Sequence, residues 1–231
     1  MPEATEAYQE NLEALVSTRT EQLRQAMSDL EHAQDCIIEA YGDALQLKHP
    51  ATAAHSRRLV PFSIALGRVM QLNALEIHPI ARAAFLHDVG KLAIPDAVLA
   101  KGSLLTDDEQ QTLQRHCVWG YEIVTKIRFL SPVAKLIVAH HENWDGTGYP
   151  HGLKTESIPI GARMIAVLNA FDNMSYRQAQ SFEVAVQEIT SAAGTRFDPQ
   201  IVEAFLRVPQ STWREIGKEA EVFGGLSLSQ Q

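Results

Sequence analysis

Residues Phe85–Lys91 read Phe-Leu-His-Asp-Val-Gly-Lys and place a histidine beside a carboxylate at the end of an apolar segment. The spacing of apolar residues from about Leu75 to Asp88 predicts a helix, which Gly90 ends. Neutral imidazole and carboxylate are the usual ligands of divalent metals. A solvated helix end is the alternative interpretation of this pair, so the rest of the chain has to decide between them.

Histidines gather at the expected helix ends. Five of the nine lie there, most of them just after apolar residues: His55, His87, His116, His140 and His141. Buried helical faces exclude so many imidazoles unless something binds them. Neighbours on a helix point about 100° apart, so a His-Asp or His-His pair suits two ions better than one. The sequence therefore predicts a shared metal site in which Asp88 can bridge both ions.

The composition limits the classes of partner. The 231 residues are enough for one domain and an appendage, and the net charge of -8 argues against broad nucleic-acid binding. A small anionic substrate stays open because bound metals reverse the local potential. Cys36 and Cys117 fit neither a disulfide framework nor a cysteine-based metal site. No signal peptide and no membrane span is recognisable, so we expect a cytoplasmic protein.

The first 47 residues predict one long helix, since no proline or glycine stands between Glu3 and Gly42. Apolar residues recur every seven positions in two seams: Val16, Leu23, Leu30, Ile37 and Ala44, and, with Arg19 as the exception, Leu12, Ala26, Ala33 and Ala40. Such heptads indicate a coiled coil. We expect a helix at 1–47 that forms a homodimer or recruits a separate sensory or receiver partner. An amphipathic helix folded on its own domain is the alternative.

The rest of the chain predicts further helices and no strand. We expect them at about 52–72, 75–88, 106–127, 131–141, 160–174, 181–193 and 198–208. Pro61 should kink the first or mark its start, and Thr106 with Glu109 forms a capping box. The pattern is broken near His49, and Gly224–Gln231 is expected to be disordered. The predicted class is all-α, with a helical domain at 48–208 and a partly disordered tail at 209–231.

These motifs resemble a known family. His55-Ser-Arg-Arg-Leu, the 85–91 stretch, His116, the pair His140-His141 and the loop from Asp145 to Pro150 follow one another as in the HD-GYP family of metal-dependent phosphohydrolases. The resemblance covers roughly residues 45–207. It implies an HD-type helical bundle around a metal centre and hydrolysis of the bacterial messenger cyclic di-GMP to pGpG or GMP.

The resemblance also implies a role for each site residue. The metal ligands would be His55, His87, Asp88, His116, His140, His141 and Asn169. They would hold two divalent ions, with Fe or Mn favoured over Mg, Ni or Zn. The glutamate that family members use for a third ion is replaced by Ala51. Asp88 would orient the attacking water, and Lys91 would offset charge on the phosphate.

Other residues are expected to bind the nucleotide or a partner. Arg58, Tyr176 and Arg177 would contact the substrate. The loop Gly148–Pro150 would shape the pocket rim or dock a diguanylate cyclase. Two departures matter: Asn169 stands where the family has an aspartate ligand, and the link to Tyr176 is short. We therefore keep two functions open, an active cyclic di-GMP phosphodiesterase and a weak or inactive module that binds metal and nucleotide, or a partner, without turnover.

Overall fold

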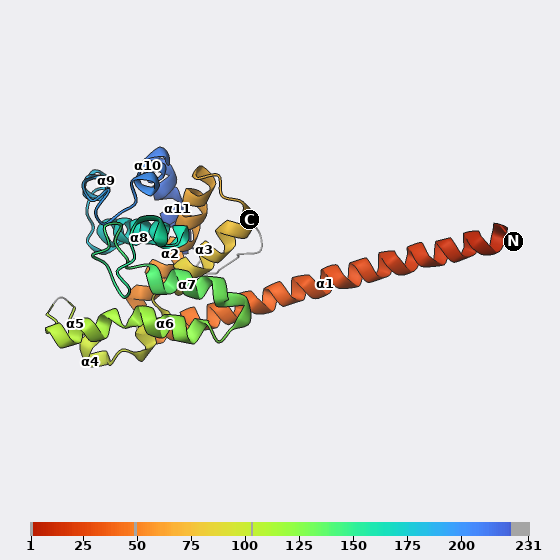
Figure 1. Ribbon diagram of the computed structural model, residues 1–231, viewed down its shortest axis with the longest axis horizontal. Helices are drawn as coiled ribbons and strands as arrows, with labels where there is room; N and C mark the ends of the chain where they lie inside the picture. The colour runs from red at the N-terminus through yellow and green to blue at the C-terminus, as the bar shows by residue number, and fades with distance from the viewer. Residues whose placement is uncertain (1, 49, 103, 223–231) are drawn as a thin grey trace. The chain divides into compact units, whose positions relative to one another are not determined.

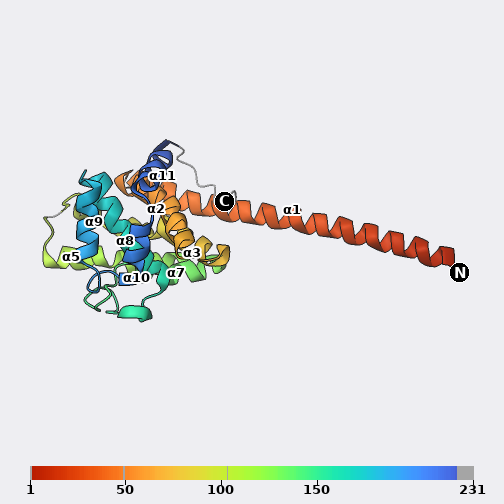
Figure 2. The ribbon, with the colours of Figure 1, turned by 90° about the horizontal axis from the view of Figure 1, so that it is seen from above.

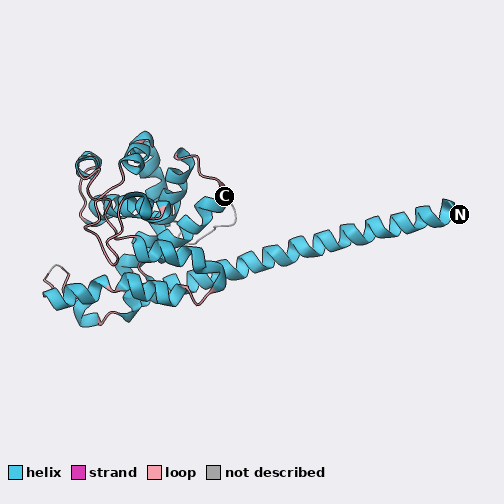
Figure 3. Ribbon diagram, viewed as in Figure 1, coloured by secondary structure: helices cyan, strands magenta, loops and turns pink. Residues whose placement is uncertain are grey.

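The computed structural model describes residues 2–48, 50–102 and 104–222, and this part of the chain is built from helices (Figures 1 and 3). Its only β-pairing is an isolated bridge between Ala193 and Phe197, so the all-α prediction is confirmed. His49 and Gly224–Gln231, on which two expectations fell, lie outside the described residues. No helix in the described ranges combines the length and apolar character needed to cross a membrane.

The α-helices follow in chain order. Their bounds are α1 Pro2–Lys48, α2 Pro50–Val69, α3 Ala74–Leu86, α4 Asp96–Leu99, α5 Asp107–Gln114, α6 His116–Val124, α7 Ser131–Ala139, α8 Ile160–Asp172, α9 Phe182–Ser191, α10 Pro199–Arg207 and α11 Gln210–Val222. Shorter turns are the 3₁₀ segments η1 Val89–Ala93, η2 Arg128–Leu130 and η3 Thr155–Ser157, and the π-helical η4 Asn173–Arg177.

The chain divides into two compact units. The first contains α1 up to Glu39, and its seam residues Leu23 and Leu30 are 62% and 58% exposed. The predicted long helix is therefore present, while its pairing with a second copy stays a prediction. The second unit begins at Ala40, before the expected boundary at 47/48, because Leu45 is buried and Gly42 lies against the ring of Phe85.

The second unit is a helical bundle in which α2 packs on α3, α8 and α11 (Figures 1 and 2). Its core includes an aromatic cluster of Phe62, Phe171, Phe205 and Trp213, with neighbouring ring centroids 5.0–5.6 Å apart. Edge-on and offset rings of this kind stabilise a core beyond the area that they bury. The helices that carry the five site histidines are thus attached to one packed core.

Local signals explain most helix boundaries, with two corrections. Capping boxes at Asn73 and Thr106 begin α3 and α5. Pro61 neither begins nor ends α2, which continues through it because packing on three helices outweighs one lost hydrogen bond. The helix expected at 106–127 is two helices that meet at Arg115. That break places His116 in the first turn of α6.

The sequence expectation also differs from the structure after Val208. Residues expected to begin a tail form α11, and the side chain of Trp213 is fully buried in the aromatic cluster. The surrounding sequence is mostly polar, so the apolar face of α11 depends on few residues. A single buried tryptophan removes enough apolar surface from water to attach such a helix.

Candidate metal centre

Three residues from α2 and the end of α3 form a first donor group. The ligand atoms of His55, His87 and Asp88 all lie within 4.8 Å of one another, and all three residues are buried. His55 Nε2 lies 3.3 Å from His87 Nε2. Two nitrogens that share a tetrahedral ion at the usual distance of about 2.0–2.1 Å stand roughly 3.3 Å apart. The spacing therefore fits a shared ion.

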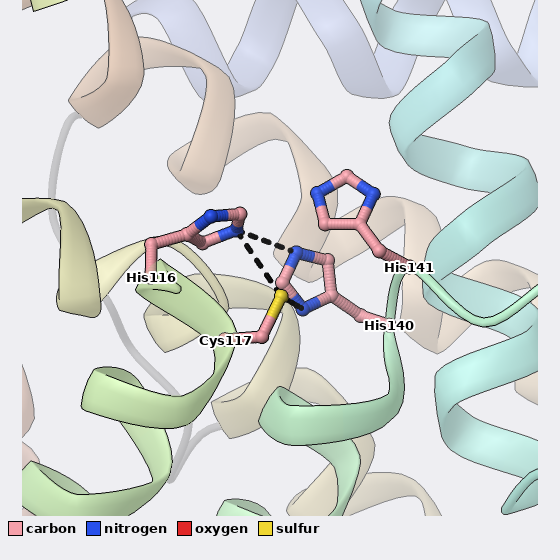
Figure 4. Close-up of side chains that lie close together, drawn as sticks. All are labelled: His116, Cys117, His140 and His141. Atoms are coloured by element: carbon pink, nitrogen blue, oxygen red, sulfur yellow. Dashed lines mark hydrogen bonds between the residues drawn. The ribbon is translucent and has the colours of Figure 1, made fainter. Parts of the chain in front are cut away.

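A second donor group joins α6 to the end of α7 (Figure 4). It contains His116, Cys117, His140 and His141, whose ligand atoms also lie within 4.8 Å of one another. His116 Nε2 lies 3.3 Å from His140 Nε2, the spacing found in the first group. The neighbours His140 and His141 thus both belong to this group instead of separating between two groups. α7 ends at Ala139 with His140 as its C-cap, so His141 lies beyond the helix, and the two ring centroids are 4.1 Å apart.

Hydrogen bonds fix which nitrogen each imidazole presents. Carbonyl oxygens accept only, so a ring nitrogen bonded to one must carry the proton. Nδ1 donates in this way in three of the histidines: His87 to Ala84 O at 2.8 Å, His116 to Leu113 O at 2.7 Å and His140 to Ile137 O at 2.6 Å. His55 Nδ1 lies 2.6 Å from the Asp172 carboxylate. Their unprotonated Nε2 atoms therefore face the centre, as in metal sites whose outer partners orient the ligands.

Asp88 connects the two groups. Its Oδ2 lies 3.5 Å from His87 Nε2, and its Oδ1 lies 3.5 Å from His116 Nε2. Lys91 Nζ donates to Oδ2 at 2.6 Å, whereas Oδ1 is buried and has no hydrogen-bond partner among the described residues. A buried unpartnered carboxylate oxygen is costly. A cation between it and the imidazole lone pairs explains this arrangement, so the donor set fits divalent metal ions.

The protonation states agree with this fit. Burial lowers the pKa of His87 to about 4, and burial with neighbouring imidazoles holds those of His140 and His141 well below the ordinary value. Burial would raise the Asp88 pKa, but Lys91 and the surrounding histidines outweigh it and hold that pKa well below its usual range. Near neutral pH these three imidazoles are therefore neutral and Asp88 is a carboxylate, the forms that bind metal.

A cavity of about 410 Å³ adjoins the second group. Its walls include His140, His141, Tyr149, Asn169 and Arg196. The ring of Tyr149 stacks on His141 with centroids 4.8 Å apart and planes 22° from parallel. Ligand sites in proteins usually have volumes of about 300–1,000 Å³. The cavity is thus large enough for a small ligand beside the imidazoles.

Comparisons with known proteins now identify the family. The family model described as HD domain matches residues 39–201. The chain belongs to the HD domain family. Its curated relatives place it in the HD-GYP type. The bundle is also similar to the crystal structure of a cyclic GMP-AMP specific phosphodiesterase of Vibrio cholerae, with a TM-score of 0.57, 22% identity and coverage of 82% of this chain and 54% of that one.

Two similar relatives are named as cyclic di-GMP phosphodiesterases. The response regulator RpfG of Xanthomonas campestris pv. campestris is 34% identical over 81% of this chain and 51% of its own length. A protein of Thermotoga maritima is 34% identical over 74% of this chain and 48% of its own. The 3'3'-cGAMP-specific phosphodiesterase 2 of Vibrio cholerae is 36% identical, over 78% and 36%. The chain spans about half the length of the first two relatives.

The segment that contains the Gly-Tyr-Pro loop is held in place by hydrogen bonds from its backbone N–H groups. Buried Glu142 accepts hydrogen bonds from the N–H groups of His151 and Leu153 at 2.7 and 2.9 Å. Trp144 N donates to Arg196 O at 3.1 Å, which brings the segment after α9 to the cavity. A side chain at Gly148 would clash with the backbone of the preceding turn. Arg196 was not predicted, because this connection is visible only in the fold.

Three residues predicted to bind nucleotide lie elsewhere in the HD domain. Arg58 is buried and donates to Asp172 through Nε at 2.6 Å and Nη2 at 2.9 Å. Its guanidinium lies 4.6 Å from the centroid of Tyr176, whose side chain packs against Gly217 of α11. Arg177 is exposed. None of the three lines the 410 Å³ cavity. Asp172 is occupied by His55 and Arg58, so it does not take the place of Asn169 as a donor.

Proposed function

We propose that this HD domain is a metal-dependent phosphodiesterase that hydrolyses cyclic di-GMP to pGpG or GMP. The observation that carries the proposal is Asp88, whose two oxygens face separate histidine groups. Such an arrangement suits two cations, and Fe or Mn is the preferred pair, with Mg, Ni or Zn as alternatives. The names of the similar phosphodiesterases support the reaction class.

The chain's own residues would perform most of the orientation. Bound cations would polarise the phosphoryl oxygens and lower the pKa of a coordinated water. Asp88 is held at Oδ2 by Lys91, which leaves Oδ1 directed at the second group. The Lys91 ammonium is thus held beside Asp88, where it would offset charge that develops on a phosphate bound there. Asp172 fixes the His55 ring so that Nε2 faces inward.

The cavity supplies groups that suit a cyclic dinucleotide. Arg196 lines the cavity. Its planar guanidinium would pair with phosphate oxygens through two parallel hydrogen bonds. Tyr149 offers an aromatic face, and Asn169 offers an amide. The relatives include enzymes named for cyclic di-GMP and for 3'3'-cGAMP, so both nucleotides should be assayed.

The direct test uses purified full-length protein loaded with Mn²⁺ or Fe²⁺. Cyclic di-GMP and 3'3'-cGAMP are supplied in parallel, and products are separated by chromatography. We expect hydrolysis of cyclic di-GMP and its loss in Asp88→Asn. Asp43→Asn is the matched control, because that carboxylate is 70% exposed and lies in a surface ion pair with Arg57. Absence of turnover in the metal-loaded protein would reject the enzymatic proposal.

A second candidate function rests on Asn169. Its neutral amide lines the cavity beside His140 and His141. An amide oxygen binds a cation more weakly than a carboxylate because it carries no charge. In this alternative the HD domain binds metal and nucleotide without turnover and acts as a sensor. Asn169→Asp discriminates: a rise in hydrolysis supports a ligand position at this residue, and unchanged activity with unchanged metal affinity argues against it.

A further inference from the structure

Cys117 lies inside the second donor group, a position that no sequence pattern predicts. It follows His116 in the first turn of α6, and its side chain is fully buried. Its Sγ lies 3.5 Å from His116 Nε2 and 4.0 Å from His140 Nδ1. Figure 4 shows the sulfur directed at these two rings, with His141 beside them. A buried cysteine usually behaves as a small apolar side chain, but this one faces imidazole nitrogens.

The spacing of the sulfur is that of a ligand. Zinc-type ions hold sulfur at about 2.3 Å and imidazole nitrogen at about 2.0–2.1 Å. In tetrahedral geometry these lengths place sulfur and nitrogen roughly 3.5 Å apart, which matches the distance from Sγ to His116 Nε2. His116 Nδ1 is bonded to Leu113 O, so Nε2 is the nitrogen free to share an ion with the sulfur. The unpartnered Oδ1 of Asp88 points at the same nitrogen from another direction.

We propose that Cys117 is a thiolate ligand of the cation held by the second donor group. The proposal rests on the metal centre of the proposed function and deepens it. On binding, the S–H bond breaks, the proton leaves to solvent, and the sulfur lone pair takes a coordination position. Cations deprotonate a coordinated thiol in this way, and no oxidant or reductant is needed.

Charge balance favours this assignment. Asp88 is the one carboxylate in the two donor groups, and Asn169 in the cavity wall carries no charge. The other carboxylate of that wall, Glu142, accepts hydrogen bonds from the backbone of His151 and Leu153. Two divalent cations would bring four positive charges, and Lys91 adds another beside them. A thiolate at Cys117 would supply a second negative charge inside the second group. Asn169 without a charge and Cys117 with one are thus complementary parts of the same site.

A sulfur ligand also determines which cations this group prefers. Thiolates favour Zn²⁺, Fe²⁺ and Co²⁺ over Mg²⁺, which prefers oxygen ligands. The first donor group, with two imidazoles and Asp88, contains no sulfur. The two groups would therefore differ in selectivity, and the second would retain a softer ion when Mg²⁺ is abundant.

Cobalt titration of the metal-free full chain tests the proposal. A Co²⁺–thiolate bond produces sulfur-to-metal charge-transfer absorption in the near ultraviolet, whereas Co²⁺ bound by nitrogen and oxygen does not. We expect this band in the wild type and in Cys36→Ser, whose exposed cysteine lies on α1. We expect the band to be lost in Cys117→Ser. The Zn²⁺ affinity of this variant should also fall by about 10- to 100-fold or more, because removal of even a hydrogen-bond partner of a metal ligand costs that much. Mg²⁺ affinity should change much less.

The outcomes separate this proposal from the proposed function. Wild-type protein that binds Co²⁺ by equilibrium dialysis without the band overturns the thiolate ligand, whether or not Cys117→Ser folds. A band that survives in Cys117→Ser also overturns it. Hydrolysis of cyclic di-GMP is followed in the same samples. Turnover without the band keeps the phosphodiesterase and rejects the ligand, and a Cys117-dependent band without turnover keeps the ligand and rejects the phosphodiesterase.

Discussion

Replacing Asp172 by asparagine should destabilise the HD domain and weaken its metal site together. The carboxylate is fully buried and accepts hydrogen bonds from His55 Nδ1 and from two nitrogens of Arg58. Asparagine keeps the size but removes the charge, and its NH₂ group must face a donor. The buried Arg58 guanidinium then loses its counterion. Removing one partner of a buried ion pair costs about 3–5 kcal/mol.

Asp172→Asn should have two measurable effects. For a chain of this size each kcal/mol lowers the melting temperature by about 2–4 °C, so we expect a fall of roughly 6–20 °C in the metal-free protein. The His55 ring also loses the partner that fixes its tautomer, so ion affinity should fall about 10- to 100-fold. Circular dichroism during heating measures the first effect, and isothermal titration with Mn²⁺ or Zn²⁺ measures the second.

The matched control is Asp43→Asn. Its carboxylate lies 3.5 Å from Arg57 and is 70% exposed, so the same substitution should cost less than about 1 kcal/mol. The double variant Arg58→Met with Asp172→Asn should be less destabilised than the sum of the single changes, because no charge remains buried without a partner. If Asp172→Asn melts within a degree or two of the wild type and binds metal equally well, the reasoning about this pair is wrong.

Three further predictions follow. Burial lowers the pKa of folded His87 from its ordinary value of 6.5 to about 4, so the folded state binds fewer protons than the unfolded state between these pH values. As pH drops from 6.5 through 4, this residue should lower the unfolding free energy of the metal-free protein by roughly 3 kcal/mol. Urea titration at each pH measures this fall. Arg196→Gln should raise KM for cyclic di-GMP about tenfold or more with a smaller change in kcat, because a charge-assisted phosphate contact of about 1.5–3 kcal/mol is lost. Leu23→Glu with Leu30→Glu should convert a dimer to a monomer in sedimentation velocity, because both exposed side chains belong to the predicted seam.

Each of these predictions has its own control. His87→Asn should flatten the acid branch of the stability profile, and an unchanged slope would contradict the assignment. Arg128→Gln, an exposed arginine outside the cavity wall, should leave KM unchanged. Ser28 lies on α1 away from the seam, so Ser28→Glu should leave the sedimentation coefficient unchanged. A wild-type monomer at micromolar concentration would contradict pairing through α1.

The predictable part of the site consists of residues with strong local signals. Helix-end histidines and the His87-Asp88 pair stand out because polar residues in apolar surroundings are costly without a ligand. The structure brings the five predicted histidines into the two donor groups, joined by Asp88. Capping boxes and proline positions likewise predict most helix starts, because those interactions are formed within a few residues.

The rest depends on contacts between distant segments. Cys36 and Cys117 are too far apart in the sequence to predict a cysteine-based metal site. The partners of Cys117 in the structure, His140 and His141, come instead from the end of another helix. Arg196 reaches the cavity through a backbone hydrogen bond to Trp144 that no local pattern predicts. The fold of α11 depends on a docking surface for Trp213, which exists only after α2 and α8 have packed.

The positions of Arg58 and Tyr176 argue that another residue of this HD domain binds the phosphate. Arg58 is an ion-pair partner of Asp172, and Tyr176 stacks on its guanidinium while packing against α11. To contact substrate, Arg58 would have to leave the buried Asp172 carboxylate without its cationic partner, at a cost of about 3–5 kcal/mol. A phosphate contact returns only about 1.5–3 kcal/mol. The difference favours Arg196, which already lines the cavity, as the phosphate ligand and leaves Arg58 to hold Asp172, and through it His55, in place.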